Sequence, residues 1–108
     1  MKRIQFPDPW VRGKMVHADV EVTRYADDST ALLLNEEGER YATASVNLSE
    51  YGFTPRSPDL VWLKTWSENE GLVEHLIDCG VVELVGAEVT LVYGNVAVLA
   101  RINPEYLT

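Results

Sequence analysis

Apolar and polar side chains alternate along much of this chain, and that alternation predicts β-strands. The clearest stretch is residues 15–25, where small apolar residues occupy every second position: Val16, Ala18, Val20 and Val22. A period of two over this length is typical of an antiparallel strand with one buried and one solvated face. Turn-forming residues at 27–29 separate it from a second strand over 30–35, so the pair predicts a hairpin.

Two more strands are predicted in the central part of the chain. Residues 35–38 form a turn, with Gly38 at the position that favours positive φ. The strand over 40–48 is predicted to direct four residues inward: Ala42, Ala44, Val46 and Leu48. An irregular loop over 49–59 follows, which can either carry function or simply connect. Residues 60–66 are apolar on both faces, as in a strand in the middle of a sheet or beneath a helix.

A single helix is predicted over residues 68–79. Ser67 and Glu70 have the spacing of a capping box, in which each side chain bonds the backbone amide of the other residue. An apolar stripe then repeats at helical spacing: Leu72, Val73, Leu76 and Ile77. Gly80 is expected to end the helix as a C′ glycine. Gly71 would lie inside the first turns at a cost of about 1 kcal/mol relative to Ala, which indicates close approach by another segment or a partner.

The remaining segments complete the predicted fold. Three short strands are expected at residues 81–85, 88–93 and 96–102, with turns at Gly86 and at 94–95. We expect residues 1–13 to be irregular and 103–108 to form a tail without a usable pattern. The class is α+β: a β-meander followed by β-α-β-β-β, giving one antiparallel sheet of six or seven strands with one helix packed on it. A chain of 108 residues is expected to form a single domain over 1–108.

The charge distribution narrows the choice of partners. Seventeen acidic and nine basic side chains give a net charge of −8. Residues 1–24 carry +2 and the rest of the chain carries −10, with no basic residue between Lys64 and Arg101. Such a surface repels phosphates, so direct binding to nucleic acid or anionic membrane is disfavoured and a basic protein surface is the expected partner. Acidity that serves only solubility is the alternative.

The expected compartment is the cytoplasm. One cysteine cannot form an intramolecular disulfide, which favours a reducing environment. No apolar run approaches the ~20 residues of a membrane helix, and the first ten residues lack the apolar core of a signal peptide. We therefore predict a cytoplasmic protein that does not enter a membrane.

Two segments resemble a family of small bacterial proteins. They are residues 41–48, YATASVNL, and residues 64–71, KTWSENEG. In that family a Tyr-Ala strand ends in Val-Asn-Leu, and a lysine and an aromatic residue precede Ser-Glu-Asn-Glu-Gly. The similarity continues at Gly80, Val82 and Glu83 and covers roughly residues 41–102. The family is catalogued as a domain of unknown function and is often found on plasmids and phages. The resemblance implies an accessory protein of a mobile element and supplies no catalytic residues.

The candidates for catalysis and metal binding are weak. His75 and Cys79 are four residues apart, but His17 is the only other histidine and a catalytic zinc site needs three protein ligands. Cys79 is at the end of the predicted helix, where the dipole raises a thiol pKa, so a buried structural cysteine is favoured over a nucleophile. Trp62 and Trp66 are interpreted as core. We predict no catalytic residue, metal or cofactor.

The leading hypothesis is a non-enzymatic protein that binds a basic partner through its predicted helix. The proposed contacts are Glu68, Asn69, Glu70, Glu74 and Asp78. One alternative is a small-ligand binder or small enzyme with a site near residues 67–71 and the 49–59 loop. Another is a homo-oligomer subunit that pairs through a sheet edge or a tryptophan patch.

Overall fold

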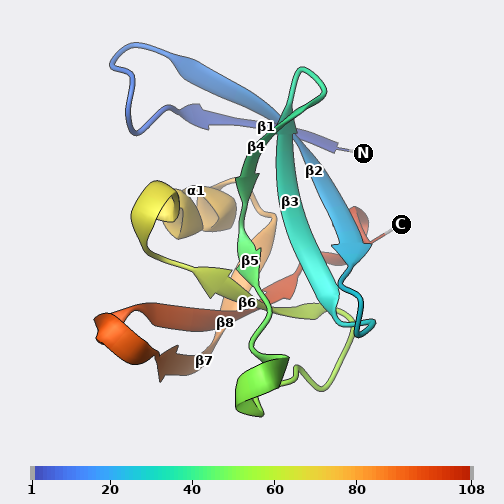
Figure 1. The fold of residues 1–108 in the computed structure, drawn as a ribbon. Coiled ribbons are helices and arrows are strands. Elements are labelled where there is room, and N and C mark those ends of the chain that lie inside the picture. Colours follow the sequence, from blue (N-terminus) through green and yellow to red (C-terminus); the bar gives the residue numbers. More distant parts are fainter. Residues whose placement is uncertain (1, 108) are drawn as a thin grey trace.

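Two four-stranded antiparallel sheets and one helix make up the fold of the computed structural model, which describes residues 2–107 (Figure 1). The first sheet has the order β1-β2-β3-β4 and the second β5-β6-β8-β7. The strands are β1 (Lys2–Pro7), β2 (Met15–Arg24), β3 (Thr30–Glu36), β4 (Glu39–Thr43), β5 (Ser45–Val46), β6 (Leu60–Lys64), β7 (Val82–Thr90) and β8 (Val96–Ile102). The α+β class is confirmed, whereas the predicted single sheet of six or seven strands is not.

The two sheets meet at Ala44, between β4 and β5. Its backbone N–H donates to the Leu32 carbonyl of β3 at 3.0 Å, and its carbonyl accepts from the Lys64 amide of β6 at 2.9 Å. One residue is therefore bonded to both sheets. Ala42 and Ala44 lie in the main core, while Leu48 belongs to a second apolar cluster. Alternation over 40–48 predicted a strand but gave no sign that the chain changes sheet within it.

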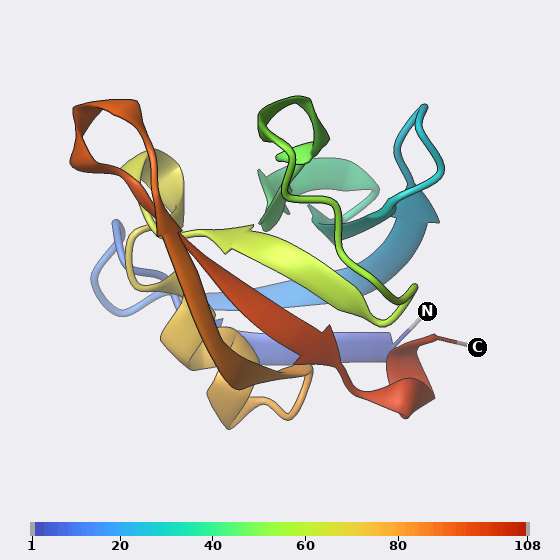
Figure 2. The same cartoon turned by 90° about the horizontal axis from the view of Figure 1, so that it is seen from below.

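The main core lies between the two sheets. The predicted inward face of β2 is confirmed, since Val16, Ala18 and Val20 are at most 3% exposed. Six fully buried residues come from the neighbouring strands: Leu32, Leu34, Val61, Leu63, Ala100 and Ile102. Helix α1 (Leu72–Asp78) lies between β1 and β7 and closes this side of the core (Figure 2). Burial of this apolar surface, at about 25 cal/mol per Å², is the main stabilising term.

The helix begins later than predicted. Residues Ser67–Asn69 form a separate 3₁₀ turn, and Gly71 precedes α1 with φ 81°. The capping-box prediction was wrong, because no side chain caps this helix and Ser67 has φ 58° in place of the extended backbone of an N-cap residue. A glycine at position 71 is therefore explained by its left-handed backbone and not by the close approach of another segment. Nothing lies within 4 Å of a Cβ placed there.

The end of the helix agrees with the prediction. Gly80 has φ 75°, its amide donates to the Ile77 carbonyl at 3.0 Å, and the Val81 amide donates to the Leu76 carbonyl at 2.9 Å. These two bonds form a Schellman motif, which satisfies carbonyl groups that the last turn leaves free. The role of Gly80 as a structural cap is confirmed.

Substituting Gly71 with alanine is expected to destabilise the protein by about 1–2 kcal/mol, because alanine is strained in the left-handed region. If Gly71 were inside the helix, the change in stability would have the opposite sign, because alanine would then stabilise the protein by about 1 kcal/mol. Urea denaturation of wild type and Gly71→Ala distinguishes the two. Gly71→Asn should destabilise the protein less than Gly71→Ala does, because asparagine tolerates the left-handed backbone better than alanine. A more stable Gly71→Ala variant would mean that α1 extends through this position.

Two strand predictions were wrong. Residues 2–7 were expected to be irregular but form β1, which pairs antiparallel with β2 and buries Ile4 and Phe6. Pro7 at the end of this strand, followed by a second proline at position 9, concealed its alternation. The predicted strands 81–85 and 88–93 are one strand, β7, whose pairing with β8 shifts around Gly86. Gly86 therefore marks a bulge and not a turn.

Candidate functional site

Four of the five predicted partner contacts are on the surface. Glu68, Glu70, Glu74 and Asp78 are exposed. Only Glu74 and Asp78 lie on α1, since Glu70 comes before Gly71 and has a non-helical backbone. The helix therefore carries one acidic pair at a spacing of four residues, whose repulsion costs a few tenths of a kcal/mol.

The fifth predicted contact, Asn69, is completely buried. Its Nδ2 donates to the Thr43 carbonyl at 2.8 Å, while its Oδ1 is buried without a hydrogen-bond partner. The side chain ties the turn before the helix to the end of β4. Asn69 is therefore inaccessible to a partner in this conformation, and its assignment as a surface contact needs correction.

Glu68 carries an ionised carboxylate at ordinary pH. A hydrogen bond from the Ser67 hydroxyl is the largest cause that lowers the pKa of Glu68 to about 2, followed by its own backbone amide and by Lys64. The Lys64 Nζ lies 3.0 Å from Oε1 of Glu68. Because the pKa of Glu68 is lower in the folded state, its carboxylate stabilises the fold at pH values above the pKa of the unfolded chain. This contribution is lost as the pH falls towards 2. Because the Glu68 side chain is 56% exposed, water screens the pair and its contribution is small.

His75 and Cys79 both pack against β1 and help to hold the helix there. The His75 ring stacks on Phe6 with ring centroids 5.1 Å apart. The Cys79 thiol donates to the Gln5 carbonyl at 3.4 Å, and burial is the main factor that raises the pKa of Cys79. A thiol with a raised pKa is a poor nucleophile at neutral pH, so the geometry gives Cys79 a structural role.

An apolar groove lies between the 3₁₀ turn Ser49–Tyr51 and the connection from β7 to β8. Its volume is about 430 Å³, and its lining is Tyr51, Phe53, Val89, Thr90, Leu91, Val92, Tyr93 and Asn95. Large side chains around it face solvent: Tyr51 is 63% exposed, Val92 70% and Tyr93 97%. Both loops lie on the same side of β6 and β8 (Figure 2).

A second, smaller core forms the base of this apolar groove. Trp62 is 7% exposed, its indole Nε1 donates to the Phe53 carbonyl at 2.8 Å, and the two rings meet edge to face at 6.2 Å. Trp66 packs on the same cluster, as do Val89 and Leu91 of the groove. The prediction that Trp62 is core is confirmed, and Trp66 is partly buried. The base of the groove is therefore held by packing and one indole hydrogen bond.

Sequence reasoning missed the apolar groove because Val92 and Tyr93 were assigned to a strand. They belong instead to a 3₁₀ turn, Val92–Gly94, in which Tyr93 has φ 70°. A large aromatic residue beside the turn residues Gly94 and Asn95 was the available signal, since turns at the ends of strands expose their side chains.

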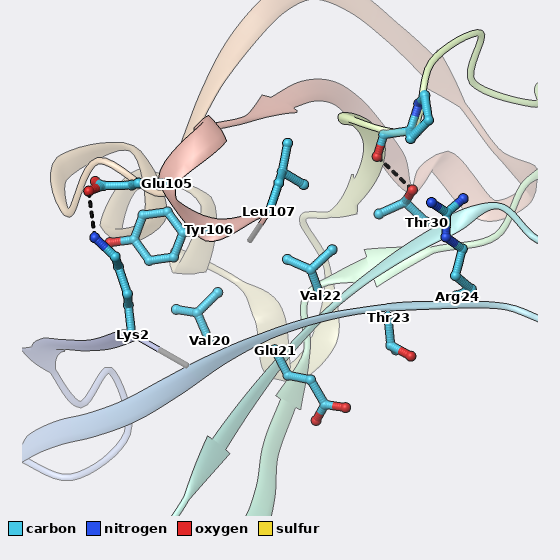
Figure 3. Close-up of a pocket in the computed structure, with 11 residues that line it drawn as sticks. Lys2, Val20, Glu21, Val22, Thr23, Arg24, Thr30, Glu105, Tyr106 and Leu107 are labelled. Atoms are coloured by element: carbon cyan, nitrogen blue, oxygen red, sulfur yellow. Dashed lines mark hydrogen bonds and ion pairs between the residues drawn. The ribbon is translucent and has the colours of Figure 1, made fainter.

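A cavity larger than the apolar groove lies between β2 and the 3₁₀ turn Pro104–Tyr106 (Figure 3). Its volume is about 550 Å³. The Lys2 Nζ lies 2.8 Å from Oε2 of Glu105 across one end, and Pro58 of the 49–59 loop lines the other. Residues 67–71 line neither this cavity nor the apolar groove, whereas residues of the 49–59 loop line both.

Comparison with known proteins adds no family. A scan against protein-family models found no match, and neither did searches of curated proteins and of solved structures. Across residues 2–107, the structure contains no helix long and apolar enough to cross a membrane.

Proposed function

We propose that this protein is a non-enzymatic binding protein that holds a basic partner protein at the apolar groove. The observation that carries the proposal is the exposure of Val92 and Tyr93, at 70% and 97%, beside a cavity with an apolar base. Exposed apolar patches on folded proteins commonly mark protein-interaction sites. Tyrosine is also enriched among the residues that dominate binding energy. The groove is small, so it fits one or two apolar side chains of the partner.

The acidic residues supply the second part of the proposal, the basic character of the partner. Exposed Glu50 directly precedes Tyr51, and Glu68 follows Trp66, which packs on the base of the groove, by two residues. Glu70, just before α1, and Glu74 and Asp78 on α1 are also exposed and add to the negative charge of the protein. Such charges speed association with a basic surface, while the apolar anchor supplies the affinity.

The resemblance to proteins of plasmids and phages suggests where the partner is found. On this hypothesis the protein is a cytoplasmic accessory protein of a mobile element. Its partner is then a host enzyme that acts on nucleic acid. The acidic residues would occupy the basic surface with which that enzyme binds phosphates.

The first test compares two exposed aromatic residues. Tyr93→Ser should reduce capture of a specific protein from host lysate by about tenfold or more, the loss expected for an interface hot spot. Trp10→Ser is the matched control, because Trp10 is 65% exposed in the turn between β1 and β2. Quantitative mass spectrometry of the captured proteins gives the readout. Equal capture by wild type and Tyr93→Ser would overturn the assignment of the groove.

The second arm of this test isolates charge. The double variant Glu74→Lys/Asp78→Lys should weaken the same capture and reduce its salt dependence. Glu37→Lys/Glu39→Lys changes the net charge equally at two exposed residues in and after the β3–β4 turn and should retain capture. A complex unchanged in molar salt would contradict the basic partner. If light scattering instead shows a concentration-dependent mass that Tyr93→Ser abolishes, the homo-oligomer alternative replaces the proposal.

A further inference from the structure

We propose that the cavity between β2 and the Pro104–Tyr106 turn binds a small amphipathic anion, one with an apolar body and a single carboxylate or sulfonate group. It shares no lining residue with the apolar groove, so it is a separate site and does not depend on the proposed function. Its volume of about 550 Å³ lies within the roughly 300–1,000 Å³ typical of small-molecule sites.

The apolar body is matched by the middle of the cavity. Val20 and Val22 of β2 form one wall, and Tyr106 and Leu107 stand opposite (Figure 3). Leu107 is 40% exposed although it faces these valines. An apolar ligand between the two walls would remove this surface from water, at about 25 cal/mol per Å².

The charged group is matched by Arg24, which stands on the same side of β2 as Val20 and Val22 (Figure 3). Its Nη1 donates to the Asp28 carbonyl at 3.0 Å, and among residues 2–107 no carboxylate forms an ion pair with it. The remaining N–H groups of the guanidinium are the fork that binds carboxylates with two parallel hydrogen bonds.

Of the other charged residues that line the cavity, two form an ion pair and the third points away from it. Lys2 is paired with Glu105 at 2.8 Å. Glu21 points away from the cavity and accepts a hydrogen bond from Asn35 at 2.8 Å (Figure 3). Arg24 therefore places a guanidinium without an ion-pair partner among residues 2–107 at one end of a cavity whose middle is lined by Val20, Val22, Tyr106 and Leu107. This pattern selects an anion with an apolar body over a cation or a neutral polar molecule.

A fluorescence titration with anilinonaphthalene sulfonate tests the site in the full chain. This probe has the required chemistry, an aromatic body with one sulfonate, and its emission rises in an apolar site. We expect saturable binding that octanoate displaces and that the neutral analogue octanol displaces much less. Arg24→Gln should weaken binding by about tenfold, the effect of losing a hydrogen bond to a charged group.

Two variants provide the controls. Arg40→Gln removes another arginine that bonds an uncharged partner, Asn35 Oδ1 at 2.8 Å, and should leave the dissociation constant within about twofold. Tyr93→Ser alters only the apolar groove and should also have no effect. Equal binding by Arg24→Gln and wild type overturns the proposal, as does loss of binding in Tyr93→Ser.

Discussion

Replacing Leu76 with alanine is expected to lower the free energy of unfolding by about 2–5 kcal/mol. Leu76 lies on α1 with 0% of its surface exposed and packs in the main core between the two sheets. Removing its side chain deletes buried methyl groups and leaves a cavity that the rigid sheets cannot fill by collapsing. Both effects lower stability.

The adjacent residue supplies the control for this substitution. Ile77 belongs to the same predicted apolar stripe but is 39% exposed. Ile77→Ala should therefore lower the free energy of unfolding by less than Leu76→Ala does, because part of the Ile77 side chain is already in water. Urea denaturation of both variants measures the difference. Equal losses would show that α1 docks on the sheets through a different face.

Replacing Asn69 with aspartate is expected to destabilise the protein by about 3–5 kcal/mol, the effect of an uncompensated buried charge. The carboxylate would have no donor for the Thr43 carbonyl, which now accepts from Nδ2 at 2.8 Å. The Oδ1 atom already has no partner, so the site offers nothing to stabilise a second negatively charged oxygen.

A second substitution separates charge from packing at this position. Asn69→Ala removes the donor together with the unpartnered acceptor, so its loss should be smaller, about 1–3 kcal/mol. Denaturation at neutral pH gives both values. If Asn69→Asp were as stable as wild type, the side chain would be solvated, and its predicted role as a partner contact would be restored.

The strands were the most predictable part of the fold because alternation reports burial directly. The inward face of β2 was read correctly, and so were the two apolar faces of β6, with Val61 and Leu63 on one side and Trp62 on the other. The bend at Ala44 was not predictable, because alternation describes a strand without identifying the sheet to which it is bonded.

The start of the helix was predicted wrongly because the same residue pattern is compatible with two local structures. Ser67 and Glu70 satisfy the spacing of a capping box, yet Ser67 and Gly71 both adopt positive φ and form a turn ahead of the helix. The sequence also suggested that Asn69 was exposed, since polar residues at a helix start usually are. Its burial depends on the β4 carbonyl that it meets, a tertiary contact that local sequence does not encode.

The acidic character of the surface was predictable from the sequence, but the position of the apolar groove was not. The excess of acidic side chains is a property of composition, and Glu68, Glu70, Glu74 and Asp78 are exposed as predicted. The apolar groove, by contrast, brings together Tyr51 and Tyr93, which are far apart in sequence. Only the pairing of β6 with β8 and of β8 with β7 brings these two loops together.

The most direct test of the central claim is amide chemical-shift mapping of the ¹⁵N-labelled protein with its captured partner. We expect the largest changes at residues 51–53 and 89–95, around the apolar groove. Smaller changes should reach Glu68 and Glu70, next to the partly buried Trp66. Changes confined to β1, β2 and β3, with the groove unaffected, would contradict binding at the apolar groove.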